Sequence, residues 1–274
     1  MIRINDLHFS YPGSRHRVFD GLNLSLESDS IYGLLGKNGE GKSTLLYLLS
    51  GLLRAPRGEV KFLGMDMKER RAEALQEIFI VPEEYDLPRM TMKQFIELNR
   101  QFYPRFSEEM LRGCLRDFEM SEVVDLKSLS MGQKKKVYMS FALAANTRLL
   151  LMDEPTNGLD IPSKSLFRKA VANSMCEDRS IIISTHQVHD VEALLDHVLI
   201  LDEGHLKFDG STAAITEKYS FEFRQPSGMT PDVVYAEPTL QGNAVIAPRC
   251  EGSEETQLNL ELFFNAVTRN LIKQ

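Results

Sequence analysis

The segment Gly36–Ser43 has residue types and spacing that can bind a polyphosphate. It reads GKNGEGKS, follows an apolar run at residues 31–35 and precedes a run of leucines. Glycine has no Cβ, so such a loop can turn its backbone N–H groups toward an anion, and a helix that begins near Lys42 adds its positive N-terminal end. In this pattern Lys42 reaches the β- and γ-phosphates, and Ser43 places its hydroxyl on a magnesium ion.

We therefore expect a site for a nucleoside triphosphate with Mg²⁺. The predicted nucleotide-binding residues of this loop are Gly36, Lys37, Asn38, Gly39, Glu40, Gly41, Lys42, Ser43 and Thr44. The alternative is a glycine-rich turn that leads into an ordinary buried helix.

Two carboxylates follow a second apolar run, at residues 149–152. Ligands of doubly wound sheets bind where parallel strands end, so both acids are candidates for chemistry. We expect Asp153 to hold Mg²⁺, directly or through water, and Glu154 to orient or deprotonate the attacking water. The alternative is a pair of solvated loop acids after a core strand.

The elements that position these residues are predicted by hydrophobic period. Five short apolar runs alternate with segments of helical period, which indicates an α/β fold with a mostly parallel sheet flanked by helices. The runs lie at residues 31–35, 78–81, 149–152, 181–184 and 198–201. Residues 1–7 and 60–62 suggest additional antiparallel edge strands.

Composition shifts divide the chain further. Residues from about 84 to 130 are rich in helix formers and are expected to form a helical subdomain inserted in a domain of residues 1–210. Residues 211–274 are expected to form a small mixed extension, with short strands at 221–223, 233–235 and 244–246 and a helical end at 260–272.

Charge and cysteine usage limit the partners and the compartment. A net charge of −7 over 274 residues argues against a nucleic-acid-binding surface, and we expect the basic run Lys134–Lys136 to be a solvated face. Three scattered cysteines are typical of a reducing compartment, so a cytoplasmic location is expected. No apolar run approaches the roughly 18 residues that span a bilayer as a helix, so a membrane role requires a partner.

With these residues in place, the chain resembles the ATP-binding subunit of ABC transporters over about residues 1–210. Leu129–Gln133, LSMGQ, is similar to that family's LSGGQ signature, with Met131 in place of the commoner glycine. The resemblance implies that the signature contacts the γ-phosphate held by the other subunit of a head-to-tail dimer. Its residues here are Ser130, Met131, Gly132 and Gln133. Considered alone, Ser130 and Gln133 also fit a capping box at a helix start.

Two further segments match the family in order. Glu154 is followed by PTNGLD, which resembles the D-loop and implies that Asp160 crosses the dimer interface. The alternative there is a turn formed by Asn157 and Gly158. Ser184-Thr185-His186 resembles the switch segment, which implies that His186 contacts the γ-phosphate and is catalytic together with Glu154 and Lys42.

Two more positions of the family pattern, the A-loop and the Q-loop, have counterparts in this sequence. Tyr11 stands where the family's A-loop places an aromatic ring on adenine; the alternative is an ordinary tyrosine in an edge-strand turn. Glu83 replaces the glutamine that is common in the Q-loop. An acid can still lie near Mg²⁺ or water, although its charge changes the local electrostatics; the alternative is a solvated acidic turn.

The resemblance implies an ATPase that binds ATP and Mg²⁺ and dimerises with a second copy or a similar subunit. It would drive a separate integral membrane permease, peripherally bound at the inner face of the cell membrane. Glu83 and the segment 260–268 resemble export-type subunits. The alternatives are a soluble ABC-type ATPase that acts on ribosomes or DNA and a nucleotide-binding regulatory module without turnover.

Overall fold

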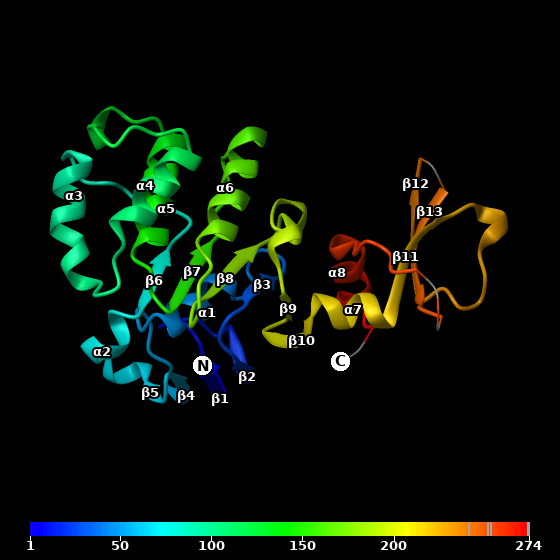
Figure 1. Ribbon diagram of the computed structural model, residues 1–274. Helices are drawn as coiled ribbons and strands as arrows, with labels where there is room; N and C mark the ends of the chain where they lie inside the picture. Colours follow the sequence, from blue (N-terminus) through cyan, green and yellow to red (C-terminus); the bar gives the residue numbers. More distant parts are fainter. Residues whose placement is uncertain (241, 251, 253, 273–274) are drawn as a thin grey trace.

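The main sheet of the computed structural model, which describes residues 1–240, 242–250, 252 and 254–272, has six strands in the order β10-β9-β3-β8-β7-β6. All but β10 run parallel (Figure 1). The strands are β3 (Ile31–Leu35), β6 (Ile78–Val81), β7 (Leu149–Asp153), β8 (Ser180–Thr185), β9 (His197–Asp202) and β10 (His205–Ser211). The five apolar runs of the sequence are its five parallel strands, so the predicted α/β fold is confirmed.

These runs are continuous because the sheet is covered on both faces. In β3, Ile31 and Leu35 pack in one apolar cluster while Tyr32 and Leu34 pack in another on the opposite face. Every residue of β3, β7 and β8 is buried.

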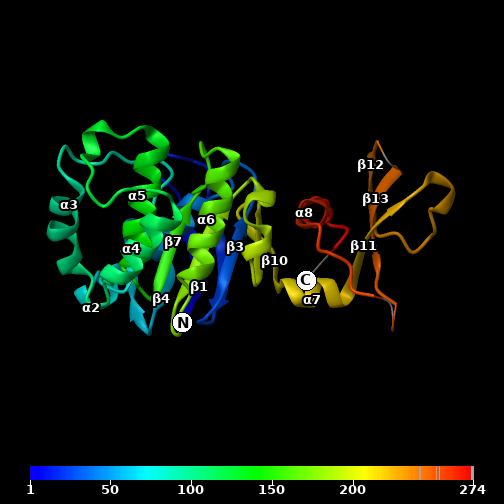
Figure 2. The ribbon, with the colours of Figure 1, turned by 45° about the horizontal axis from the view of Figure 1, so that its top comes forward.

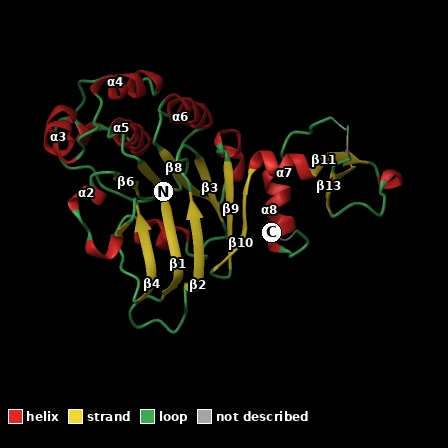
Figure 3. Ribbon diagram, turned by 60° about the horizontal axis from the view of Figure 1, so that its bottom comes forward, coloured by secondary structure: helices red, strands yellow, loops and turns green. Residues whose placement is uncertain are grey.

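One face of the main sheet carries a helix and a second sheet. Helix α1 (Lys42–Leu49) packs its leucines in the same apolar cluster as the inward residues of an antiparallel sheet ordered β2-β1-β4-β5. Its strands are β1 (Ile2–Phe9), β2 (Phe19–Leu26), β4 (Arg57–Phe62) and β5 (Met65–Asp66). The antiparallel strands expected near residues 1–7 and 60–62 thus form their own sheet (Figure 3).

The opposite face is covered by helices. In Figure 2, α5 (Met131–Ala144) and α6 (Ile161–Asn173) lie over β7 and its neighbours, and Phe141 and Phe167 are fully buried there. Between β6 and α5 the chain forms α3 (Met92–Asn99) and α4 (Glu108–Asp117) with the single turns η2 (Arg100–Phe102) and η3 (Leu126–Ser128). A short α2 (Ala72–Leu75) and the turn η1 (Met67–Glu69) precede β6.

Past β10 the chain forms a small α/β unit. It consists of α7 (Thr212–Lys218), a three-stranded antiparallel sheet ordered β11-β13-β12, and α8 (Leu260–Thr268). The strands are β11 (Tyr219–Arg224), β12 (Tyr235–Thr239) and β13 (Gly242–Pro248), and the turn η6 (Pro226–Gly228) follows β11. Helix α8 lies between β10 and this sheet (Figure 1), where Phe263 packs against Phe208 and Phe221.

The sequence-based boundaries in this unit need correction. Strand β12 begins only at Tyr235, because Val233 closes a turn by donating its N–H to Thr230 O at 3.2 Å. Helix α8 ends at Thr268 and not at residue 272. The turns η4 (Val188–Asp190) and η5 (Glu192–Leu194) connect β8 to β9. Among the described residues, no helix combines the length and the apolar character needed to cross a membrane.

Candidate functional site

The loop between β3 and α1 has the backbone of an anion cradle. Gly39 and Gly41 have φ values of +91° and +95°, in the left-handed region that favours glycine. A Cβ on Gly41 would lie 2.7 Å from Val18 Cγ1, and one on Gly36 would lie 2.8 Å from Leu201 O. Helix α1 has no acidic residue in its first turn and no side-chain cap, so its N-terminal N–H groups remain available to a bound anion.

Lys42 lies beneath this loop with its side chain turned back into it. It is 6% exposed, and its Nζ donates to Gly36 O at 2.7 Å and Lys37 O at 3.1 Å. Burial lowers the pKa of Lys42, while the carboxylates of Glu154 and Asp153 oppose that shift. Among the described residues, this ammonium group donates hydrogen bonds to the two carbonyl oxygens and forms an ion pair with Glu154 at 3.8 Å, so it can also bind phosphate oxygens.

The remaining loop residues are divided between solvent and the protein. Lys37 and Asn38 are exposed, and Ser43 is half-buried in the first turn of α1. Glu40 accepts a hydrogen bond from the N–H of Glu203. Thr44 is buried and its Oγ1 lies 3.0 Å from Tyr11 Oη, so the structure brings Tyr11 to the loop.

Tyr11 presents part of a ring beside the cradle. It packs edge-on against Phe9, with ring centroids 5.1 Å apart, and remains 42% exposed. Such a ring can stack on a planar base.

The two carboxylates at the end of β7 have separate partners. Asp153 is 2% exposed and accepts a hydrogen bond from Ser184 Oγ. Glu154 is 5% exposed; Thr185 Oγ1 donates to its Oε2 at 3.1 Å. Because Ser184 and Thr185 end the neighbouring strand β8, the parallel register itself supplies both hydroxyl groups.

Glu154 also joins His186 to Lys42. The His186 backbone N–H donates to Glu154 Oε1 at 3.0 Å and the ring Nδ1 lies 2.7 Å from the same oxygen. A carboxylate can only accept, so the shared hydrogen lies on Nδ1. Lys42 Nζ lies 3.8 Å from that oxygen. The structure therefore brings together Lys42, Glu154 and His186, the three residues predicted to be catalytic.

The signature residues lie apart from this cluster. Ser130 caps α5 and forms the full capping box with Gln133, whose Oε1 accepts from the Ser130 N–H at 3.0 Å. Met131 is 69% exposed, and a Cβ on Gly132 would meet nothing within 4 Å. Among the residues that the structure describes, these four share no hydrogen bond or ion pair with the cradle.

Asp160 and Glu83 occupy the loops beside the cluster. Asp160 caps α6 and accepts from Ser163 N at 2.9 Å; hydrogen bonds from Ser163 lower its pKa. Glu83 is exposed and accepts from Asn157 Nδ2 at 2.9 Å. Lys135, expected on a solvated face, is half-buried and donates from Nζ to Asn157 O. Its place in a run of three lysines gave no signal of this contact.

Comparison with known proteins agrees with this geometry. The family model described as ABC transporter matches residues 19–157. The ABC transporter ATP-binding protein YtrB of Bacillus subtilis (strain 168) is 30% identical over 75% of this chain and 70% of that protein. NatA, another ABC transporter ATP-binding protein of that strain, is 31% identical over 72% of this chain and 82% of its own length.

A solved structure described as the ATP-binding subunit of an ABC transporter has the same fold. It superposes with a TM-score of 0.70 at 24% identity, over 78% of this chain and 91% of that one. The phosphate cradle, the carboxylates at the end of β7 and these relatives agree, and the chain belongs to the ABC transporter family as an ATP-binding subunit with ATPase activity.

Proposed function

We propose that this chain hydrolyses ATP with Glu154 as the residue that orients and deprotonates the attacking water. The observation that carries the proposal is the position of its carboxylate, fixed by Thr185 and His186 and 3.8 Å from Lys42 Nζ. Lys42 stabilises the negative charge of the γ-phosphate as the P–O bond breaks. His186 contacts both Glu154 and the γ-phosphate and so positions one relative to the other.

The donor set of the site fits Mg²⁺. Mg²⁺ prefers oxygen ligands and binds through one or two carboxylates together with substrate phosphates. Ser43 and Asp153 provide a hydroxyl and a carboxylate, and we assign them as the ligands, with Glu83 as a third candidate. When bound, Mg²⁺ would neutralise charge on the phosphate oxygens.

The test of the catalytic assignment is Glu154→Gln. Glutamine keeps the shape and an acceptor oxygen but cannot take a proton, so we expect hydrolysis to fall at least a hundredfold, a common size for loss of general-base catalysis, with ATP binding retained. Phosphate release measures the first and equilibrium binding of labelled ATP the second. Hydrolysis at the wild-type rate would refute the assignment.

We further propose that two copies, or this chain and a similar subunit, close head-to-tail around two ATP molecules. Among the described residues, the signature shares no hydrogen bond or ion pair with the cradle of its own chain. Met131, within the signature, and Ile161, next to Asp160, are apolar and 69% and 85% exposed. Exposed apolar residues next to polar binding residues are typical of an interaction surface. Tyr11 would stack on the adenine.

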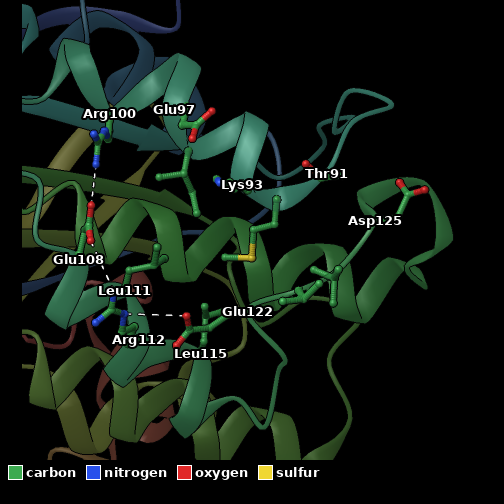
Figure 4. Close-up of a pocket in the computed structure, with 14 residues that line it drawn as sticks. Thr91, Lys93, Glu97, Arg100, Glu108, Leu111, Arg112, Leu115, Glu122 and Asp125 are labelled. Atoms are coloured by element: carbon green, nitrogen blue, oxygen red, sulfur yellow. Dashed lines mark hydrogen bonds and ion pairs between the residues drawn. The ribbon is translucent and has the colours of Figure 1, made fainter.

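A groove in the helical segment supports a permease partner. It has a volume of about 690 Å³ and lies between α3, α4 and the loop before η3 (Figure 4). Its floor is apolar, and its rim carries charges of both signs, with Arg100–Glu108 and Arg112–Glu122 ion pairs. The apolar floor residues are Met92, Ile96, Leu111 and Leu115. We propose that an amphipathic segment of the membrane permease binds here.

The partner's identity and the direction of transport need separate measurements. One relative, from Burkholderia lata at 28% identity, is named Nod factor export ATP-binding protein I. Another, from Carboxydothermus hydrogenoformans at 30% identity, is named methionine import ATP-binding protein MetN. We propose export. Mass spectrometry of what copurifies with the chain from solubilised membranes would identify the permease. The complex can then be placed in vesicles with this subunit on the outer face. If the protein is an exporter, added ATP should drive cargo into the vesicle lumen. Loss of cargo from the lumen would indicate import.

We also propose that the ATPase domain ends near residue 210 and that residues 211–274 are an appendage. Support comes from the chain path, because β10 ends at Ser211 and α7 leads directly into the separate three-stranded sheet. Residues of about 84–130 form the inserted helical subdomain in this scheme.

A further inference from the structure

The turn that follows Glu154 is held by two other elements. Asn157 N donates to Glu154 O at 3.1 Å and closes the turn. Its side-chain Nδ2 donates to Glu83 Oε1 at 2.9 Å, and its carbonyl oxygen accepts from Lys135 Nζ. The loop after β6 and the first turns of α5 therefore both bind the short segment that carries the proposed catalytic base.

The same residues form a charge arrangement. Burial lowers the pKa of Lys135, whereas the carboxylates of Glu83 and Glu154 act to raise it. Lys42 experiences the same two carboxylates together with Asp153. The acids therefore act on the pKa of both lysines, and of the two only Lys42 belongs to the cradle.

We propose that Lys135 is a positioning residue for hydrolysis. Its ammonium group fixes the Asn157 carbonyl, and so the turn that orients Glu154. It also supplies the positive charge that offsets the Glu83 carboxylate beside a polyphosphate. The inference rests on the proposed role of Glu154 and adds a residue that contacts none of the reacting atoms.

Charge offset is needed because Glu83 brings a negative charge to a site that must accept a polyphosphate. Like charges that lie close together at a protein surface repel each other. Lys135 is half-buried and hydrogen-bonded to Asn157, which also binds Glu83. Its positive charge therefore reduces the repulsion between the polyphosphate and the carboxylates of Glu83 and Glu154. The need for Lys135 therefore depends on the acid at position 83.

The first experiment compares Lys135→Met and Lys135→Arg with the wild-type chain. We expect Lys135→Met to lower kcat about tenfold, because the turn that carries Glu154 loses its contact, and to raise KM for ATP by less than about threefold, because Lys135 offsets the charge of Glu83 without touching the nucleotide. Lys135→Arg keeps the charge and should stay within about threefold of wild type. The neighbouring Lys134, whose side chain makes no ion pair with any described residue, offers the matched control Lys134→Met, and melting temperatures report on folding.

The decisive experiment repeats Lys135→Met in the Glu83→Gln background. Glutamine at position 83 keeps an acceptor for Asn157 but has no charge. In this background Lys135→Met should lower kcat by only about threefold or less. Such a difference between the two backgrounds is of the size measured for residues that interact. Equal losses in both backgrounds, a loss confined to KM, or an equal loss in Lys134→Met would overturn the proposal. Glu154→Gln separates the two claims: a fully active Glu154→Gln variant refutes the catalytic assignment itself, whatever Lys135 does.

Discussion

Glu154 adopts a left-handed backbone conformation, with φ at +45°, although it has a Cβ. Such conformations cost on the order of 1–3 kcal/mol and persist where the surroundings over-determine them. Here the Glu154 N–H donates to Ser184 O at 3.0 Å, and the side chain is held by Thr185 and His186. The strain and the partners together fix the direction of one carboxylate.

A prediction follows for Thr185, whose hydroxyl holds Glu154 Oε2 at 3.1 Å. Thr185→Val removes that donor in a nearly equal volume, so the carboxylate should lose orientation while ATP still binds. We expect kcat to fall about tenfold at unchanged KM, measured by steady-state phosphate release. Thr185→Ser keeps the hydroxyl and should restore most of the rate. If valine and serine behave alike, packing and not the hydrogen bond is what matters at this position.

The sequence predicts the candidate residues that belong to a recognisable motif. It does not predict a residue such as Lys135, which is distinguished only by where the fold places it. Lys42, Glu154 and His186 each follow a buried strand, so their convergence could be predicted from the shared edge of the sheet. Lys135 sits in a run of three lysines, and only the packing of α5 against the turn at Asn157 distinguishes it from Lys134. Local sequence carries no record of such a contact between distant segments.

At the scale of elements, continuous apolar runs were sufficient to predict the five parallel strands because both faces of each are covered. Strand β10 was not predicted, since nearly every one of its residues is half-buried and no alternation marks a face. Among the apolar residues of α3 and η2, Phe95 is only 7% exposed and packs in the core, whereas Phe102 is 62% exposed. Helical spacing alone could not separate the two.

The groove between α3 and α4 gives a prediction at this scale. Val123, on its rim, is 90% exposed, so Val123→Glu should leave stability within about 0.5 kcal/mol of wild type. An added charge on an apolar docking surface should reduce the permease recovered with the tagged chain severalfold, while the free chain keeps its ATPase rate. Exposed Leu52, outside the groove lining, provides the control Leu52→Glu. Undiminished recovery with Val123→Glu would place the permease elsewhere.

For the whole molecule, the separation of the signature from the cradle is the main consequence of the fold. Ser130 caps α5, which packs on one face of the main sheet, while Lys42 begins α1, which packs on the opposite face. The sequence could predict both motifs but not how far apart they lie in the folded chain, since that separation depends on how the helices pack. If the signature serves the ATP of a second copy, damage to the two motifs in different chains should be complementary.

Mixing two inactive variants tests that arrangement. Lys42→Ala damages the cradle, and Gly132→Asp adds a charged side chain where a Cβ meets nothing within 4 Å, so it should fold normally. In a head-to-tail dimer of the two, one site carries both defects and the other carries none. Random pairing should then restore about a quarter of the wild-type rate, because about half of the dimers are mixed and each has one intact site. A cradle served by its own signature gives no recovery at any ratio. The wild-type chain assayed alone shows that two copies suffice for turnover, so a failure to complement would count against the head-to-tail arrangement and not against the ATPase activity.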